Sequence, residues 1–161
     1  MPEQLALCTK PVARLLLSHG AGAPVQSEFC QLLAEQLAKQ HIEVWGFNFA
    51  YMQKTLAGKR QLPPKMPVLM AEALEQVSQM PTDLPLVIAG KSMGGRVATL
   101  LAASHLLPAQ VKGVIAFGYP FHPPKKDNWR TEHFIGLKRP VLVLQGERDP
   151  FGSTEELAGK S

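Results

Sequence analysis

The chain of 161 residues is long enough to bury the core of one domain, and its mix of 45% hydrophobic and 19% charged residues excludes a disordered or fibrous protein. The net charge of +4 is modest and the basic residues are scattered along the chain, which argues against nucleic-acid binding. No apolar run approaches the roughly 18 residues that a membrane span needs.

Five short apolar segments, rich in leucine, β-branched or aromatic residues, are predicted to form strands. In chain order they cover residues 12–18, 42–49, 84–89, 111–117 and 141–145. Three other stretches show the spacing of amphipathic helices, namely residues 25–40, 69–77 and 93–106. In the first of these, the apolar stripe consists of Phe29, Leu32, Leu33 and Leu37. Residues 50–67 carry three prolines and several basic side chains, and we expect a loop there.

Strands that alternate with helices predict an α/β fold, with a mostly parallel sheet covered by helices on both faces. The sequence shows no internal repeat or low-complexity segment, so residues 1–161 are expected to form a single domain. In such sheets the chemistry takes place in loops at the carboxyl ends of the strands. Three glycine-containing loops fall at such ends, after Ser18, Ala89 and Gln145.

Residues 90–95, with the sequence GKSMGG, directly follow a predicted strand and begin a predicted helix. A Gly-x-Ser-x-Gly pattern in this context is typical of a nucleophile elbow, a sharp turn that holds a serine hydroxyl out at the edge of the sheet. Gly90 and Gly94 flank the serine, where strand and helix must approach closely. A phosphate-binding loop also ends in Gly-Lys-Ser, but it requires a glycine where this chain has Pro85. Ser92 is therefore the candidate nucleophile.

Residues 19–22, with the sequence HGAG, follow the first predicted strand. Enzymes with a nucleophile elbow place one oxyanion donor in this loop, and the other is the backbone N–H just after the nucleophile. We therefore expect the N–H of Met93 and that of Ala21 or Gly22 to bind the oxyanion of a tetrahedral intermediate. A glycine-rich structural turn is the alternative. His19 is expected to order this loop through hydrogen bonds rather than to act as a base.

Residues 145–150, with the sequence QGERDP, follow the last predicted strand. The triad order in this fold is serine, then acid, then histidine, which places Asp149 at the position of the acid. Glu147 is the nearby alternative, and Asp-Pro also forms ordinary turns.

No histidine follows Asp149 in the sequence. His41 is expected at the opposite edge of the sheet, and His105 lies roughly 20 Å along the helix from the nucleophile, so geometry excludes both. His122 and His133 follow the fourth predicted strand on the correct edge, and either is open as a surrogate base.

We expect instead that the C-terminal strand, the histidine loop and the last helix are absent from this sequence. Residues 153–160 have the pattern of the first turns of a helix. Ser153 is placed as its N-cap, with Glu156 three residues later, as in a capping box.

Five segments resemble the small bacterial α/β-hydrolase-like proteins of the family that includes testis-expressed protein 30. A hydrolase-like domain in a chromatin acetyltransferase complex subunit also belongs to that family. The matching segments are LLLSHGAGAP at 15–24, GKSMGGRVA at 90–98, GYPFHPP at 118–124, RTEH at 130–133 and LQGERDPFG at 144–152. The resemblance implies an α/β-hydrolase fold with Ser92 as nucleophile and Asp149 as acid. It also implies a later Gly-Asp-His segment, which this sequence does not contain.

The residues support two functions. The first is a cofactor-independent serine hydrolase of small esters or thioesters, with no metal ion, in which Ser92 attacks and Asp149 orients a histidine. The second is a non-catalytic hydrolase-like module that binds a partner. Basic residues at 54–65 and 125–130 favour an acidic substrate or partner, or form a solvated rim.

For the first function the expected partner is a small acyl substrate, with neither nucleic acid nor membrane involved, and the oligomeric state is open. The two cysteines, Cys8 and Cys30, fit neither a metal site nor a disulfide framework. Unpaired thiols of this kind suit a reducing cytoplasm, so we expect a cytoplasmic protein.

Overall fold

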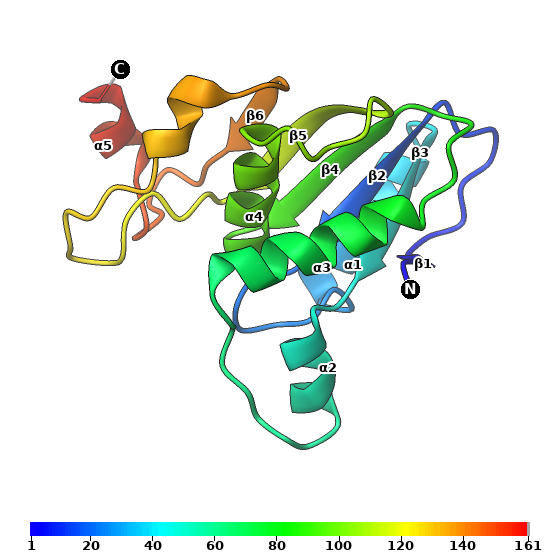
Figure 1. Cartoon of the computed structure of the whole chain (residues 1–161), viewed down its shortest axis with the longest axis horizontal. Coiled ribbons are helices and arrows are strands. Elements are labelled where there is room, and N and C mark those ends of the chain that lie inside the picture. The colour runs from blue at the N-terminus through cyan, green and yellow to red at the C-terminus, as the bar shows by residue number, and fades with distance from the viewer. Residues whose placement is uncertain (161) are drawn as a thin grey trace.

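The computed structural model describes residues 1–160, in which a six-stranded sheet is covered by helices on both faces (Figure 1). The strands are β1 (Glu3–Gln4), β2 (Ala13–Ser18), β3 (Ile42–Phe47), β4 (Leu86–Lys91), β5 (Val111–Phe117) and β6 (Val141–Leu144). The helices are α1 (Glu28–Ala38), α2 (Ala50–Leu56), α3 (Met66–Ser78), α4 (Met93–Ala102), α5 (Thr154–Ala158) and the 3-10 helix η1 (Glu132–Gly136).

The order of the strands in the sheet is β1-β3-β2-β4-β5-β6, and every neighbouring pair is parallel except β1 with β3. This arrangement confirms the predicted α/β fold. Ser18 pairs with Gly90, Lys91 with Phe117, and Phe117 with Leu144. Because these residues end their strands at one edge of the sheet, the loops after β2, β4, β5 and β6 all leave from that edge.

The two faces of the sheet pack against different helices. On β2, Leu15 and Leu17 join the core under α1, whereas Leu16 joins the core under α3 and α4. This alternation follows from the two-residue period of a strand, and it makes the central strands apolar on both faces. The turn between β4 and α4 therefore follows a strand that is buried on both faces.

Residues 50–67 differ from the sequence prediction, because they begin with helix α2 rather than with a loop. The helix buries Tyr51 and Met52, and the Ala50 N–H donates to the Glu72 carboxylate of α3 at 2.8 Å. A helix of seven residues is too short to be stable alone, so these tertiary contacts stabilise it. The loop follows only after residue 57 and contains Pro63 and Pro64, whereas Pro67 lies in the first turn of α3.

The ends and faces of other predicted elements also shift. Strand β1 was not predicted, β4 begins after Pro85, and α4 ends at Ala102 instead of residue 106. In α1 the buried residues are Cys30 and Ala34, whereas Phe29 and Leu32 are 40% and 50% exposed. The predicted apolar stripe is therefore correct for Leu33 and Leu37, which pack against the core, and wrong for Phe29 and Leu32.

Candidate active site

Ser92 occupies a strained turn between β4 and α4. Its φ of 51° and ψ of −112° lie in a region that residues other than glycine rarely adopt, at a cost of roughly 1–3 kcal/mol. The Ser92 N–H donates to the carbonyl of Phe117 at 2.9 Å, which ties the turn to the end of β5. The structure thus places the serine in the strand–turn–helix geometry of a nucleophile elbow.

Three glycines allow this close approach of strand and helix. A Cβ at Gly90 would overlap the backbone of Gly94 and Gly95, and a Cβ at Gly94 would lie 2.8 Å from the His19 carbonyl oxygen. A Cβ at Gly95 would lie 2.9 Å from that of Ala116 on β5. The sequence pattern anticipated the first two glycines, whereas the role of Gly95 appears only in the packed structure.

The loop after β2 lies against the elbow. A Cβ at Gly20 would be 3.6 Å from that of Ser92, so little separates the two turns. Ala21, Gly22 and Ser92 line a common pocket of about 310 Å³. Met93 is the first residue of α4, and its N–H therefore has no acceptor within the helix. The structure thus brings Ala21 and Gly22 next to Ser92, the residue that precedes Met93.

His19 is 1% exposed and binds backbone groups through both ring nitrogens. Its Nδ1 lies 2.7 Å from the Gly20 carbonyl oxygen, and its Nε2 accepts from the Phe49 N–H at 3.0 Å. One donor and one acceptor describe a neutral imidazole. Burial lowers the pKa of His19, which favours the same neutral form. His19 orders the loop, as predicted.

Tyr51 is a residue of this site that the sequence did not reveal. Its hydroxyl donates to the Ala21 carbonyl at 3.0 Å and so fixes the orientation of that peptide. Burial raises the pKa of Tyr51 to about 12, so the hydroxyl keeps its proton throughout the neutral range. Residue 51 fell in a predicted loop, and its partner is 30 residues away, so no local pattern could identify it.

Asp149 lies in the loop after β6, beside the end of β5. A Cβ at Gly118 would be 3.5 Å from the Asp149 Oδ2 atom, and Asp149 Oδ1 accepts from the Phe151 N–H at 2.8 Å. Phe151 also lines the pocket that contains Ser92. Glu147, the alternative acid, is exposed. The Asp149 carboxylate thus lies next to the loop after β5.

All five histidines belong to the described residues, and none of them forms a hydrogen bond to Ser92. His133 Nε2 lies 2.9 Å from the Thr99 hydroxyl on α4, and His122 Nε2 lies 2.8 Å from a carboxylate oxygen of Glu156 on α5. Burial, followed by the charge of Arg96, lowers the pKa of His133. The remaining two are exposed: His41 precedes the first residue of β3, and His105 follows the C-terminal end of α4, so both lie at the ends of their elements away from the elbow.

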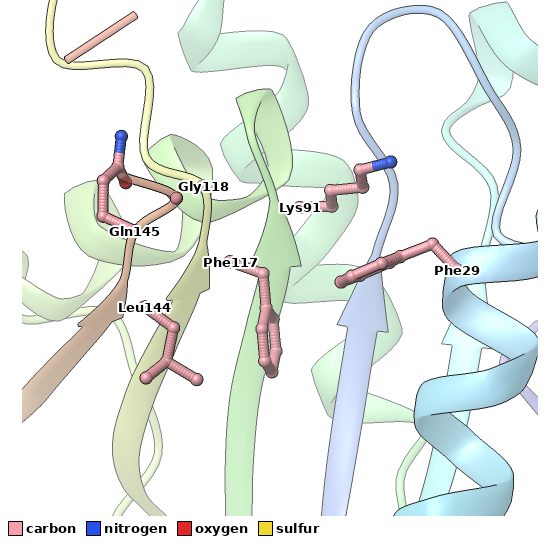
Figure 2. Close-up of a pocket in the computed structure, with 7 residues that line it drawn as sticks. Phe29, Lys91, Phe117, Gly118, Leu144 and Gln145 are labelled. Carbon is pink, nitrogen blue, oxygen red and sulfur yellow. The ribbon is translucent and has the colours of Figure 1, made fainter. Parts of the chain in front are cut away.

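A second hollow lies beside the elbow, on the α1 face of the sheet (Figure 2). It has a volume of about 460 Å³ and an apolar floor that includes Phe117 and Leu144. Phe29 extends from α1 toward it, and the Lys91 ammonium lies 4.7 Å from the centre of the Phe29 ring. The exposed Phe29 ring thus contacts a residue adjacent to Ser92.

Two features are absent from the described residues 1–160. No group of three or more histidine, cysteine or acidic side chains is arranged to hold a metal ion. No helix there combines the length and hydropathy needed to cross a membrane.

A parallel sheet with a strained serine between β4 and α4, and with a glycine loop against it, defines an α/β-hydrolase domain. The chain belongs to this family, because a family model described as "Alpha/beta hydrolase domain" matches residues 11–161.

Solved structures show the same fold. A structure described as an alpha-beta serine hydrolase homologue from Coxiella burnetii has a TM-score of 0.68 and 17% identity, over 99% of this chain and 73% of its own. Dienelactone hydrolase from Anabaena variabilis has a TM-score of 0.63 and 15% identity, over 99% and 93%. Est1E from Butyrivibrio proteoclasticus has a TM-score of 0.65 and 14% identity, over 93% and 73%.

Proposed function

We propose that this chain carries the nucleophile, the oxyanion site and the acid of a serine hydrolase that acts on small acyl substrates, either esters or thioesters. The observation that carries the proposal is the strained Ser92, held at φ 51° in a pocket that it shares with the glycine loop. A backbone strain of this kind persists only where the surrounding structure enforces it, and it is characteristic of functional sites.

In the proposed reaction, Ser92 Oγ attacks the acyl carbon while its hydroxyl proton passes to water or to an added base, and a tetrahedral intermediate forms. The intermediate collapses to an acyl-serine with departure of the protonated alcohol or thiol, and water then hydrolyses the acyl-serine. The N–H of Met93 and that of Ala21 or Gly22 donate to the oxyanion, and one such donor contributes on the order of 3 kcal/mol. Asp149 is proposed as the acid that orients the base. Since no histidine of residues 1–160 is hydrogen-bonded to Ser92, we expect acylation to be slow. Serine proteases that lack one triad member retain only roughly 10³–10⁴-fold catalysis over water.

Labelling with a fluorophosphonate probe tests the proposal. We expect slow labelling of the wild-type chain at Ser92, faster labelling when imidazole is added as an external base, and none in Ser92→Ala. Ser27→Ala is a matched control, because Ser27 lines the same pocket and should not affect the reaction beyond loss of an N-cap. Mass spectrometry of the labelled peptide identifies the modified residue.

If the wild-type chain stays unlabelled with and without imidazole, the hydrolase proposal is wrong. Rapid turnover without imidazole would contradict the expected slow acylation and would favour His122 or His133 as the base.

A non-catalytic hydrolase-like binding module is the second candidate, and one observation favours it: no described histidine is positioned to activate Ser92. The resemblance to the family of testis-expressed protein 30 and of a chromatin acetyltransferase complex subunit also supports it. We propose a cytoplasmic location for either function, based on the free thiols of Cys8 and Cys30. Absence of labelling, with the fold intact by circular dichroism, is the outcome that this candidate predicts.

A further inference from the structure

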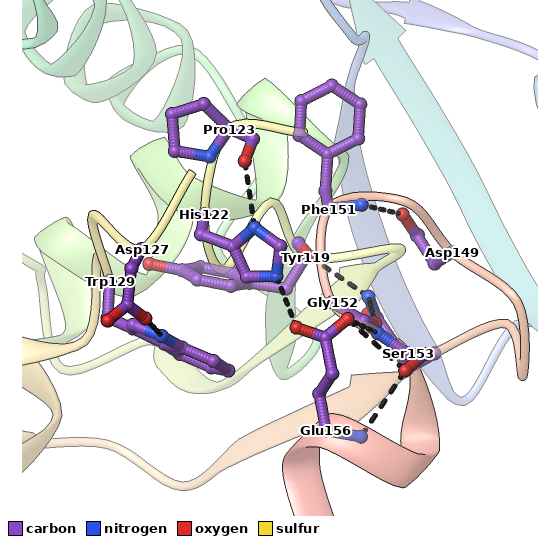
Figure 3. Close-up of polar contacts among 11 residues, drawn as sticks. Tyr119, His122, Pro123, Asp127, Trp129, Asp149, Phe151, Gly152, Ser153 and Glu156 are labelled. Carbon is purple, nitrogen blue, oxygen red and sulfur yellow. Dashed lines mark hydrogen bonds and ion pairs between the residues drawn. The ribbon is translucent and has the colours of Figure 1, made fainter. Parts of the chain in front are cut away.

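His122 is 5% exposed, and both of its ring nitrogens face hydrogen-bond acceptors (Figure 3). Nδ1 lies 2.8 Å from the carbonyl oxygen of Pro123, and Nε2 lies 2.8 Å from Oε2 of Glu156. A neutral imidazole has only one N–H, so both hydrogen bonds form together only when the ring carries two protons and a positive charge. His19 differs, because one of its two partners is a donor.

Glu156 connects this imidazolium to the start of α5. Its Oε2 faces His122, while its Oε1 accepts from the backbone N–H of Ser153 at 3.2 Å and completes the capping box predicted from the sequence. The ion pair therefore holds the loop after β5 against the N-terminus of α5. The His122 side chain is 7% exposed and the Glu156 side chain 46%, so water reaches the pair from the glutamate side and screens it in part.

The same loop also holds the segment that carries Asp149. The His122 backbone N–H donates to the Phe151 carbonyl at 3.1 Å, and the N–H of Phe151 donates to Asp149 Oδ1 at 2.8 Å. Gln145 Nε2 donates to the carbonyls of Tyr119 at 3.0 Å and Gly152 at 2.8 Å. The loop after β5 is thus joined to the acid loop by a hydrogen bond at Phe151 and, through Gln145, at Gly152 (Figure 3).

We infer that His122, in its doubly protonated form, is a positioning residue that fixes the Asp149 loop through Glu156 and Phe151. The role of Asp149 as the acid rests on the proposed function. The ion pair between His122 and Glu156, called the latch below, does not depend on it. His122 acts here through the loop and has no contact with the reacting serine.

The charged groups around His122 set the direction of its pH response. Glu156 faces His122 from α5, and Asp127 faces it from the loop after β5. The centre of the Trp129 ring lies 5.1 Å from that of the His122 ring, and the Lys160 ammonium lies 4.8 Å from the centre of the Trp129 ring. The hydrogen bond to the Pro123 carbonyl raises the pKa of His122, burial opposes this, and Glu156 and Asp127 raise it further. The Ser153 N–H, and then His122, lower the pKa of Glu156.

The two shifts define the pH range in which the latch is closed. A raised histidine pKa stabilises the fold fully below the ordinary value of 6.5, and this contribution is lost as the pH rises through the folded-state pKa. A lowered glutamate pKa stabilises it above the ordinary value of 4.5, and that contribution is lost as the pH falls through the folded-state pKa. The latch is therefore complete between these values and opens on the alkaline side.

Hydrogen exchange read by mass spectrometry tests the latch without requiring catalysis. We expect the amides of residues 145–158, after correction for intrinsic exchange, to be less protected at about pH 9 than at about pH 5.5, because deprotonation of His122 removes its ion pair with Glu156. His122→Gln and Glu156→Gln should both remove this pH response and leave low protection throughout. His133→Gln is the matched control and should behave as the wild type, and peptides from β2 and β4 report whether each variant is folded.

A wild-type segment whose protection does not change with pH, or a His122→Gln variant that keeps the change, would overturn the inference. The functional consequence is read separately, from the rate of Ser92 labelling against pH. Wild type should lose labelling rate on the alkaline side, and a folded His122→Gln should be slow at every pH with no such decline. If the wild type shows the exchange response but no labelling, the latch stands and the proposed function fails.

Discussion

Replacing Gly90 by alanine is expected to lower the free energy of unfolding by more than about 4 kcal/mol, or to prevent folding altogether. A Cβ at this position would overlap the carbonyl group of Gly94 and the nitrogen of Gly95. These atoms are backbone atoms in the first turn of α4, so no side-chain rotation can relieve the overlap. To make room, α4 would have to move away from β4 and break the packing of both core faces next to Ser92.

Gly136→Ala is the matched control, because a Cβ at Gly136 has no atom within 4 Å. This change should leave stability within about 0.5 kcal/mol or raise it slightly through the unfolded state. Urea denaturation of both variants measures the difference, with soluble yield as the readout if Gly90→Ala does not fold. A Gly90→Ala protein as stable as the Gly136→Ala protein would mean that the elbow is looser than the structure shows.

The elbow could be predicted from the sequence because its glycines are needed where β4 and α4 approach closely, and all of them lie within a few residues of one another. Strand β4 and helix α4 are adjacent in the chain, so their close approach has to be encoded within residues 90–95. The same holds for the capping box of Ser153 and Glu156, whose members are three residues apart. Predictions of this kind succeed where the interacting residues are neighbours in sequence.

The sequence could not predict features that depend on distant partners. Helix α2 is stabilised by Glu72 from another helix, and Tyr51 binds the Ala21 carbonyl in the loop after β2, 30 residues before it. His122 was open as a base from its place in the chain, but its charge state follows from Glu156, which lies 34 residues later. The exposure of Phe29 likewise depends on how α1 packs against the sheet. Such roles require the tertiary structure.

Arg14→Met is expected to destabilise the chain by about 3 kcal/mol, because it leaves the Glu43 carboxylate buried without its counterion. Arg14 lies on β2 and Glu43 on β3, and the two side chains are each 11% exposed, with Nε and Oε2 2.5 Å apart. Trp45 Nε1 also donates to Glu43 Oε2 at 2.8 Å, and this hydrogen bond would remain after Arg14 is replaced. A single indole N–H does not replace the guanidinium charge.

The second partner of Arg14 provides the control. Asp83 lies 2.6 Å from Nη1, but its side chain is 69% exposed, so water solvates it when the ion pair is broken. Asp83→Asn should therefore change stability far less than Arg14→Met, although the hydrogen bond from Arg14 lowers the pKa of Asp83. The comparison shows whether the loss of stability depends on leaving a charge buried or only on breaking an ion pair.

The double variant Arg14→Met with Glu43→Met decides between two explanations for the loss. If the cost arises from an unpaired buried charge, removing Glu43 as well should restore most of the stability, since a buried ion pair is often replaced by apolar residues with little loss. If the cost arises from lost packing of the arginine stem, the second change should add to the first. Urea denaturation of the two single variants and the double variant measures the coupling. We expect recovery, because the Glu43 carboxylate loses its only cationic partner in the described chain when Arg14 is replaced.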